Sequence, residues 1–336
     1  MTSLLDPIMV KGLILKNRLV MPPMGTDLAT NKGKVTKKHL AYYKPRAREI
    51  GLVIVEHSYI DLGGRYTATQ LGIHEDSLIP GLKRLANVIS DSGATTAIQI
   101  NHSGGKCIEA ICGKQPVGPS SLKYWKEPTR GLETSEIQAL AKKFGDAAQR
   151  AVESGFDVVE IHAAHGWLLN QFASPLTNER TDQYGGSLEN RFRFPLEVIR
   201  EVRSRVGSNY PVFYRLGADD LTPGGLTIGE SKKVAPRLVE AGVDVMDISG
   251  GICGVYHPTN KSQGFFIPMA EEIKKVVPCP VIGVGGITTS KLADHYVRGG
   301  RVDLVAVGRA LMKDPDWGVK ALRTLKEKGQ VGQGIR

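Results

Sequence analysis

The sequence lacks the marks of several large classes of protein. Its 336 residues contain no run of about 18 apolar residues, the length that a membrane-spanning helix requires, so no membrane partner is expected. The N-terminal stretch carries lysines among its apolar side chains and has no small-residue cleavage site, which argues against a secretion signal. The dinucleotide-binding pattern G-x-G-x-x-G is also absent.

Cysteine is scarce, and its spacing excludes further possibilities. The four cysteines form no C-x-x-C pair and no metal-ligand spacing; they are Cys107, Cys112, Cys253 and Cys279. We therefore expect reduced thiols, a cytoplasmic protein and no bound metal.

The charge is basic but not concentrated. The sequence has 44 lysines and arginines against 34 aspartates and glutamates, a formal net charge of +10. Such a charge can attract anionic ligands such as phosphorylated cofactors or acyl-CoA esters, or can reflect an evenly solvated basic surface. No dense basic block interleaved with aromatic residues is present, so no nucleic-acid partner is expected.

Strand and helix patterns alternate along the whole chain. Short apolar runs rich in β-branched residues occur at 17–23, 51–56, 95–100, 157–162, 211–216, 243–249, 280–285 and 303–308. Helical patterns occur at 77–93, 134–155, 187–206, 227–241, 268–277, 289–299 and 315–328. Uninterrupted apolar strands are typical of parallel sheets buried on both faces. The alternation predicts an α/β fold, a TIM (β/α)8 barrel rather than a doubly wound sheet.

The length of the chain exceeds what a plain barrel needs. A barrel takes about 250 residues, and the excess falls mainly in 102–133 and 163–190, after the third and fourth strands. We expect two long loops there, on the C-terminal face where barrel active sites are built. The helix that follows the first loop is expected to open at a capping box on Thr134 or Ser135. No linker or composition shift marks a second domain, so residues 1–336 are predicted to form one domain.

Polar residues gather at the predicted carboxyl ends of the strands. Each has a structural explanation when taken alone. Arg215 could pair with Asp219 or Asp220, and Gln99 could cap its strand. Their coincidence around the whole barrel indicates an active site. The set includes Thr26, Glu56, His57, Gln99, His102, His162, His165, Arg215 and Ser249.

The ends of the last two strands indicate a phosphate site. Gly285 and Gly286 precede one helical segment, and Gly308 and Arg309 begin another. Glycines let backbone amides approach an anion, and a guanidinium suits phosphate oxygens. Barrels commonly bind phosphate in these two loops.

The residues now support a family resemblance. The stretch HAAHGWLLNQFASPLTNERTDQYGGSLENRFRF, residues 162–194, resembles the signature of the Old Yellow Enzyme family of FMN-dependent ene-reductases. That family includes the barrel domains of 2-enoate and 2,4-dienoyl-CoA reductases. The similarity covers essentially the whole chain, through DPIMVKGLILKNRLVMPPMGT, QINHSGGK, FYRLGADD, VGVGGI and AVGRALMKDP.

The resemblance implies a non-covalent FMN over the barrel mouth, reduced by NADH or NADPH. Thr26 would lie near the flavin edge, Gln99 would bond its pyrimidine side, and Arg215 would neutralise charge on the reduced ring. The other cofactor contacts that the resemblance implies are Pro23, Met24, His57, Gly285, Gly286, Gly308 and Arg309.

The histidine pair accounts for the reaction that the resemblance implies. His162 and His165 match the pair that donates hydrogen bonds to a substrate carbonyl oxygen. A hydride adds to the β-carbon of an α,β-unsaturated carbonyl compound only if the negative charge that develops on the oxygen is stabilised. The alternatives for the pair are buried structural histidines or a metal site. We assign the following run, TNERTDQYGGSLENRFRF, no chemistry, because it has turn residues and a capping serine, Ser187.

Three features depart from the family. Trp167 stands where the family has a tyrosine that usually donates a proton, and His57 stands where a small residue is common. Trp167 is therefore expected to contact the substrate, and Tyr256, in the loop after the sixth strand, becomes the candidate acid. The larger reductases continue into an iron–sulfur motif, whereas this sequence ends at Arg336 without a cysteine cluster, which favours a free-standing barrel.

We therefore expect an NAD(P)H-dependent FMN oxidoreductase that reduces the C=C bond of a small unsaturated carbonyl or acyl compound, and that forms a homo-oligomer. A related flavin dehydrogenase that runs oxidatively, for example on an amine, is the nearest alternative. A metal-dependent barrel hydrolase with His57, His102, His162 and His165 as ligands, or a non-catalytic flavin-binding barrel, also stays open.

Overall fold

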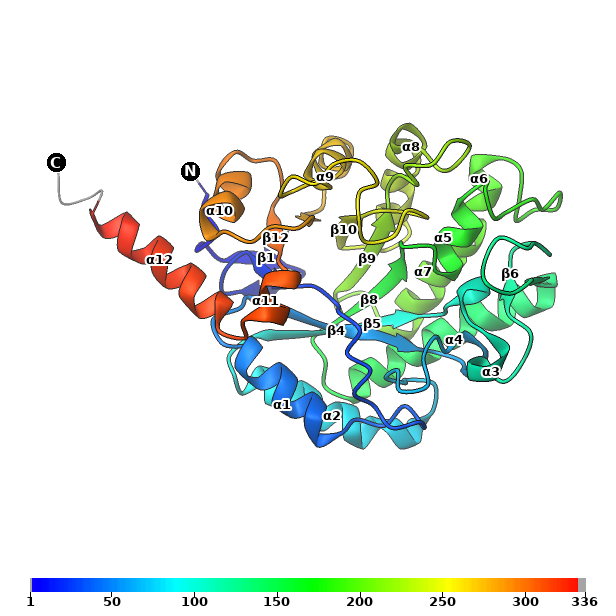
Figure 1. Ribbon diagram of the computed structural model, residues 1–336, viewed down its shortest axis with the longest axis horizontal. Helices are drawn as coiled ribbons and strands as arrows, with labels where there is room; N and C mark the ends of the chain where they lie inside the picture. The colour runs from blue at the N-terminus through cyan, green and yellow to red at the C-terminus, as the bar shows by residue number, and fades with distance from the viewer. Residues whose placement is uncertain (1, 332–336) are drawn as a thin grey trace.

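The computed structural model describes residues 2–331, and eight of their strands close into a barrel (Figure 1). These strands are β3 (Leu19–Met21), β4 (Leu52–Tyr59), β5 (Thr95–Asn101), β8 (Val158–Ala163), β9 (Val212–Gly217), β10 (Val245–Ser249), β11 (Val281–Gly283) and β12 (Leu304–Ala306). Each pairs in parallel with the next, and β12 returns to β3 to close the ring. The predicted TIM barrel is confirmed, and all eight predicted strands are present.

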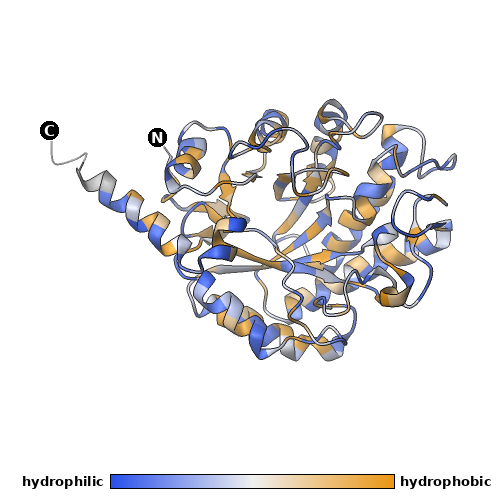
Figure 2. Cartoon of the chain, in the orientation of Figure 1, coloured by the Kyte–Doolittle hydropathy of each residue, from blue (hydrophilic) through white to orange (hydrophobic). Residues whose placement is uncertain are grey.

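Helices surround the barrel on its outer side, and α12 (Trp317–Val331) extends away from it (Figure 1). The longer ones are α1 (Lys37–Arg46), α2 (Ile79–Ser90), α4 (Thr134–Glu153), α7 (Arg193–Val206), α8 (Ile228–Glu240), α9 (Ile267–Lys274), α10 (Ser290–Arg298) and α12 (Trp317–Val331). The shorter ones are α3 (Glu109–Cys112), α5 (Leu168–Ala173), α6 (Leu188–Arg191) and α11 (Arg309–Lys313), with 3₁₀ turns η1 (Leu62–Gly64), η2 (Asp76–Leu78) and η3 (Gly104–Lys106). Figure 2 shows the strands as mostly apolar and the helices as apolar on one side, which is how a two-layer core is built.

The inward-facing residues of the strands change character along the barrel axis. Side chains alternate between the two faces of a strand, so every second residue points into the barrel. At the amino ends these residues form one apolar cluster: Val20, Leu52, Ile54, Ala97, Val158, Phe213, Val245, Ile282, Leu304 and Ala306. Two residues further along five of the strands, the same face carries Glu56, Gln99, Glu160, Arg215 and Asp247. The apolar half holds the barrel closed, and the polar half forms the floor of a site.

A hairpin that the sequence analysis missed closes the amino end of the barrel. Strands β1 (Ile8–Val10) and β2 (Leu13–Leu15) pair antiparallel, and their residues Val10 and Leu15 are buried in the apolar cluster inside the barrel. Each strand has only three residues, too few for a period-2 pattern to be recognised. The hairpin thus covers the amino end of the apolar cluster.

Two other elements differ from expectation. Helix α1 was not predicted, since KKHLAYYKPR contains Pro45 and has no apolar stripe; a capping box between Thr36 and His39 begins it. Helix α4 begins at Thr134 as expected, but the residues of its capping box are Glu133 and Glu136. The segment after β5 contains η3, α3 and a small sheet of β6 (Val117–Gly118) and β7 (Arg130–Gly131), and the segment after β8 contains α5.

Candidate active site

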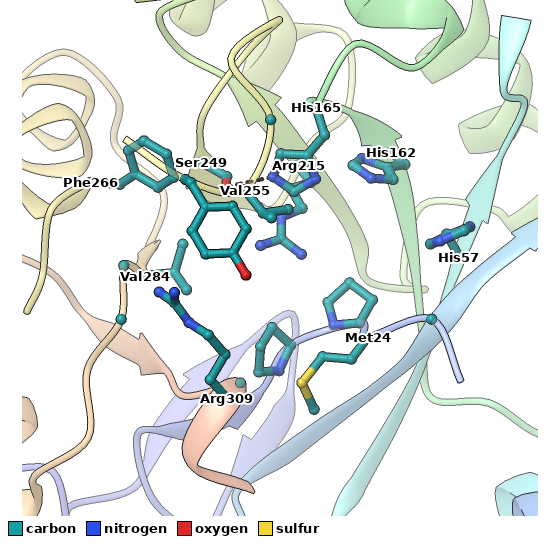
Figure 3. Close-up of a pocket in the computed structure, with 18 of the residues that line it drawn as sticks. Met24, His57, His162, His165, Arg215, Ser249, Val255, Phe266, Val284 and Arg309 are labelled. Atoms are coloured by element: carbon teal, nitrogen blue, oxygen red, sulfur yellow. Dashed lines mark hydrogen bonds between the residues drawn. The ribbon is translucent and has the colours of Figure 1, made fainter. Parts of the chain in front are cut away.

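A cavity of about 510 Å³ lies at the carboxyl ends of the strands (Figure 3). The barrel geometry brings together residues that are more than 280 positions apart in the sequence, such as Met24 and Arg309. Of the site residues predicted from the sequence, those that line this cavity are Pro23, Met24, His57, His162, His165, Trp167, Arg215, Tyr256, Gly285, Gly286, Gly308 and Arg309. Thr26 and Gln99 are not among the residues that line it.

His162 at the end of β8 and His165 just beyond it lie next to each other in the cavity wall. Their ring centroids are 5.1 Å apart and the rings are nearly perpendicular, at 87°. Nδ1 of His162 accepts from the backbone N–H of Ala164 at 3.4 Å, so its proton belongs on Nε2. Nε2 of His165 lies 2.7 Å from the hydroxyl of Ser249 on β10, which leaves Nδ1 for a ligand. Each ring therefore has one nitrogen held by the protein and one available to the cavity.

The backbone that presents these histidines is constrained. His165 has a φ of 58°, in the left-handed region that residues with a β-carbon seldom adopt, and its N–H donates to the carbonyl of Gly250 at 3.0 Å. Such a conformation persists where surrounding contacts hold it, and it is common at functional sites.

Both histidines are neutral in this site. Burial holds the pKa of His162 well below its usual range, and the positive charge of Arg215 and Lys106 and the neighbouring His165 and His57 lower it further. Burial and Arg215 do the same to the pKa of His165. A neutral imidazole can still donate one N–H. In the tautomer of His165 that accepts from the Ser249 hydroxyl at Nε2, the pair offers two hydrogen-bond donors without adding charge to a cavity that already contains a guanidinium.

The guanidinium of Arg215 lies beside the buried carboxyl groups of Asp247 and Glu160. Its Nε lies 3.2 Å from Oδ2 of Asp247, not near Asp219 or Asp220 as one alternative had it. Beside it, the side-chain amide of Gln99 donates to Glu160 at 2.9 Å. Burial and the neighbouring Asp247 raise the pKa of Glu160 well above its usual range, so burial favours the protonated form of this carboxyl.

The far end of the cavity has the features of a phosphate cradle. Gly285 and Gly286 have φ values of 138° and 68°, and a β-carbon at Gly286 would lie 2.8 Å from Nη2 of Arg309. A β-carbon at Gly308 would lie 3.1 Å from the sulfur of Met24. The positive φ values of Gly285 and Gly286 favour glycine, and the lack of a side chain leaves the backbone there open to a ligand. Figure 3 shows Arg309 at the opposite end of the cavity from His57 and His162, with Arg215 between.

The residues present fit FMN. The glycine and arginine end suits a terminal phosphate, and the Met24 side of the cavity offers an apolar surface for a flat ring. Within residues 2–331, the side-chain oxygen of Gln99 is buried without a hydrogen-bond partner, which a donor group on a ligand would supply.

Thr26 is turned away from the cavity. Its hydroxyl donates to Oε1 of Glu56 at 2.5 Å and its N–H donates to Oε2 at 2.8 Å. Two residues of α1 hold Glu56 in turn. The hydroxyl of Tyr43 accepts from the backbone N–H of Glu56, and Nε2 of His39 lies 3.3 Å from Oε1 of Glu56. The threonine thus anchors the loop that carries Pro23 and Met24.

Trp167 lies among the aromatic residues of the opposite wall. Its ring centroid is 5.2 Å from that of His57, whose Nδ1 accepts from the amide of Gln70 at 2.8 Å. Tyr66 packs edge-on against the same indole at 4.8 Å. Burial lowers the pKa of His57, so this wall is uncharged apart from one residue, Lys106.

Lys106 is a charged residue of the cavity wall to which the sequence analysis gave no role. It lies in QINHSGGK, a motif used there for the resemblance, but its side chain received no role. Its Nζ donates to the backbone carbonyl of His165 at 2.9 Å and lies 4.5 Å from the centre of the Trp167 ring. The signal in the sequence was its place four residues beyond the polar His102, in the loop after β5.

Tyr256 lies at the phosphate end of the cavity. The residue is 57% exposed, and the guanidinium of Arg309 lies 5.0 Å from its ring centre. It thus lines the cavity, as expected for a candidate acid, but packs with Arg309.

His102 does not join the other histidines. Its Nδ1 accepts from the N–H of Gly104, and its Nε2 lies 4.0 Å from Asp61. Across residues 2–331, no three histidine, cysteine, aspartate or glutamate side chains are grouped so that they could hold a metal. The four-histidine hydrolase site considered above therefore does not form.

The run after α5 is held by structural contacts. Arg180 pairs with Asp182 and donates to the carbonyls of Pro119 and Leu132, and Ser187 caps α6. These bonds tie the loop after β8 to the loop after β5.

No helix within the described residues is long and apolar enough to cross a membrane.

Comparison with known proteins agrees with this geometry. Residues 3–328 match the NADH:flavin oxidoreductase / NADH oxidase family. The chain is 43% identical over 321 residues to an NADH oxidase of Thermoanaerobacter brockii, covering 93% of this chain and 49% of that protein. It is 39% identical over 327 residues to an NADPH dehydrogenase of Bacillus subtilis (strain 168), covering 96% and 95%.

A solved structure shows the same likeness. An Old Yellow Enzyme homologue from Zymomonas mobilis superimposes with a TM-score of 0.85 at 26% identity, over 96% of this chain and 93% of that one. The resemblance inferred from residues 162–194 is thereby confirmed. The chain spans about half the length of the first relative and nearly all of the other two.

Proposed function

The chain belongs to the NADH:flavin oxidoreductase / NADH oxidase family, and on that premise we propose that it reduces the C=C bond of α,β-unsaturated carbonyl compounds. The FMN cofactor and the NAD(P)H reductant expected from the sequence are those of this family. One observation supports the proposal: His162 and His165 are neutral, each has one ring nitrogen that is not engaged by the protein, and both line a cavity whose other end contains Gly285, Gly286 and Arg309.

The cofactor is proposed to lie along the length of this cavity. Gly285, Gly286, Gly308 and Arg309 would hold its phosphate, and Pro23 and Met24 would lie beside its ring. Bound and reduced FMN supplies a hydride to the β-carbon of the substrate. Arg215 would stabilise negative charge on the reduced ring, and Gln99 would bond the ring edge. Thr26 would support this arrangement through Glu56.

The histidines are proposed to hold the carbonyl oxygen of the substrate. When the β-carbon gains a hydride, negative charge develops on that oxygen. Two fixed N–H donors in a buried site stabilise it more than they stabilise the neutral ground state, and this difference lowers the barrier. The bond from Ser249 to His165 would hold one donor in its orientation.

The test begins with the purified protein and its two half-reactions. The protein should be yellow, and it should release FMN rather than FAD on denaturation. NADH or NADPH should bleach the flavin anaerobically, and a cyclic enone should restore the colour in a stopped-flow instrument, with the saturated ketone as product. A colourless protein that cannot be reconstituted with FMN would contradict the cofactor assignment.

The other outcomes separate the alternatives. An amine that bleaches the flavin without NAD(P)H would favour the oxidative dehydrogenase instead. A flavin that binds but reacts with neither class of compound would indicate a non-catalytic flavin-binding barrel.

The proposal extends to the organisation of the protein. We propose that residues 1–336 form one FMN-binding barrel domain, that the protein is cytoplasmic, and that it forms a homo-oligomer. All four cysteines are free thiols, as a reducing compartment permits. Sedimentation measurements on the purified protein would give the oligomeric state.

A further inference from the structure

The reaction proposed above requires an acid that the family's usual residue does not supply here. After the β-carbon has gained a hydride, the α-carbon must gain a proton, and a positioned acid is worth about 10² to 10⁴ in rate. Trp167 stands at the tyrosine position, and its indole N–H can donate a hydrogen bond but does not act as an acid. The acid must therefore come from elsewhere in the cavity wall.

Lys106 stands beside that position. Its Nζ lies 4.5 Å from the centre of the Trp167 ring and donates to the carbonyl of His165 at 2.9 Å. The side chain also lines the cavity, on the same wall as the two histidines. An ammonium group is thus held between the residue that replaces the tyrosine and one of the residues that would bind the carbonyl oxygen.

The loop that carries Lys106 is fixed in place. Gln171, on α5, accepts from the N–H of Gly105 at 3.0 Å and donates to the carbonyl of Gly166 at 2.8 Å. A β-carbon at Gly166 would lie 2.7 Å from Trp125, so the two loops can approach this closely only through glycine. Trp125 also lies under the Lys106 ammonium, at 5.5 Å. The lysine is therefore held by the packing of the loops after β5 and β8.

We propose that Lys106 is the acid that protonates the α-carbon of the substrate, an assignment that rests on the proposed function. The C–H bond forms at the α-carbon as an N–H bond of Nζ breaks, and the nitrogen keeps the electron pair as a neutral amine. No electron is gained or lost in this step. A proton from solvent at the mouth of the cavity then restores the ammonium.

The acidity of Lys106 suits this role. Burial lowers its pKa to about 8, so the group is mostly protonated at pH 7 and yet gives up a proton readily. The titratable groups near it are His57 on β4, His162 on β8 and His165 in the loop after β8, all with pKa values lowered by burial. Arg215 supplies the other nearby positive charge, and it stays charged throughout.

Tyr256, the candidate from the sequence, lies less favourably. It packs against Arg309 at the phosphate end of the cavity, and its side chain is mostly exposed. Lys106 shares the wall of the histidines. The two candidates give different results in one experiment.

The experiment measures the reoxidation of the NAD(P)H-reduced holoenzyme by an enone in a stopped-flow instrument, from pH 6 to 10. The variants are Lys106→Met, Lys106→Arg, Tyr256→Phe and a control, Lys126→Met, which removes an exposed lysine of the same loop. Reoxidation by ferricyanide, which requires no proton on carbon, is measured in parallel. Flavin content and unfolding midpoint establish that each variant is folded.

For the wild type, the enone rate should fall as pH rises through about 8, because the ammonium loses its proton. Lys106→Met should lower the rate at pH 7 by about a hundredfold or more and abolish this pH dependence. Lys106→Arg should be similarly slow, because a guanidinium keeps the charge but does not release its proton. Ferricyanide rates and the Lys126→Met control should be unchanged.

Two further measurements distinguish an acid from a binding group. Reduction of an α-methyl enone in D₂O should label one face of the α-carbon with the wild type and both faces with Lys106→Met. Tryptophan fluorescence of the purified protein should change with a midpoint near pH 8, because the ammonium lies over Trp125 and Trp167, and this change should vanish in Lys106→Met.

Several results would overturn the assignment. One is an enone reoxidation rate in folded Lys106→Arg equal to that of the wild type. Another is a Lys106→Met variant that binds the enone more weakly but reacts at the wild-type maximal rate. The third is a slower enone reoxidation in Tyr256→Phe with an unchanged rate in Lys106→Met. Failure of the proposed function is a different result: the reduced wild-type flavin would then be reoxidised by ferricyanide and by no enone. If the wild type reduces enones and Lys106→Met does so equally well, only the role of Lys106 is wrong.

Discussion

Replacing His162 with alanine is expected to slow reoxidation by an enone while leaving the flavin bound and reducible by NAD(P)H. The reason is its position. His162 lies at the end of the cavity opposite to the glycine and arginine cradle that would hold the phosphate (Figure 3). The loss should therefore fall on the enone step alone.

The size of the effect follows from the geometry of the pair. Removing one donor to a developing oxyanion costs about 10²- to 10³-fold in kcat, or about 2.7–4 kcal/mol. His165 remains, with its ring centroid 5.1 Å from that of the missing ring, and it can still donate one hydrogen bond. We therefore expect a loss between about tenfold and a thousandfold, and a similar loss for His165→Ala.

The assay is anaerobic stopped-flow kinetics of both half-reactions, with flavin content measured by absorbance. His295→Ala serves as the control, because this exposed histidine on α10 is remote from the cavity wall. Equal loss of flavin and of the enone rate in His162→Ala would show that the histidine is structural, and the reasoning would be refuted. An unchanged enone rate would refute it equally.

Three further predictions test the rest of the site. Arg309→Ala should weaken FMN binding by about tenfold, the order of one charge-assisted phosphate contact, in fluorescence titrations of the apoprotein; unchanged affinity would remove Arg309 from the phosphate site. Trp167→Tyr places a phenol where the family has its acid, so it should speed reduction of weakly activated enones in steady-state assays; slower turnover with every enone, with Tyr256→Phe unchanged, would mean that Trp167 shapes the pocket instead. The buried histidines have folded pKa values below the unfolded value of about 6.5, so the unfolded chain binds more protons and the free energy of unfolding should fall as pH drops below that value. Urea unfolding should show a smaller fall in His162→Ala than in the wild type, and an equal fall would contradict the lowered pKa of His162.

The barrel could be predicted from the sequence because its determinants are local. Runs such as those at 51–56 and 303–308 are mostly apolar on both faces, and this pattern is typical of buried parallel strands whatever lies around them. That Gly285, Gly286 and Arg309 line the cavity was equally predictable, since they closely follow strands seven and eight. Helix α1 could not be predicted from the sequence, because tertiary contacts such as that of Tyr43 with Glu56 stabilise it, and it has no apolar stripe.

The sequence by itself determined the order of the strands, the family and which residue types stand at the barrel rim, because hydrophobic periodicity and motif spacing are properties of neighbouring residues. Only the tertiary structure decided which of those residues meet. It turned Thr26 towards Glu56, left His102 outside the cavity, and brought Lys106 against Trp167 through the packing of two loops. Contacts between side chains on different strands depend on burial and on backbone position in three dimensions. These contacts set the charge of His162 and the acidity of Lys106, and no local pattern in the sequence contains them.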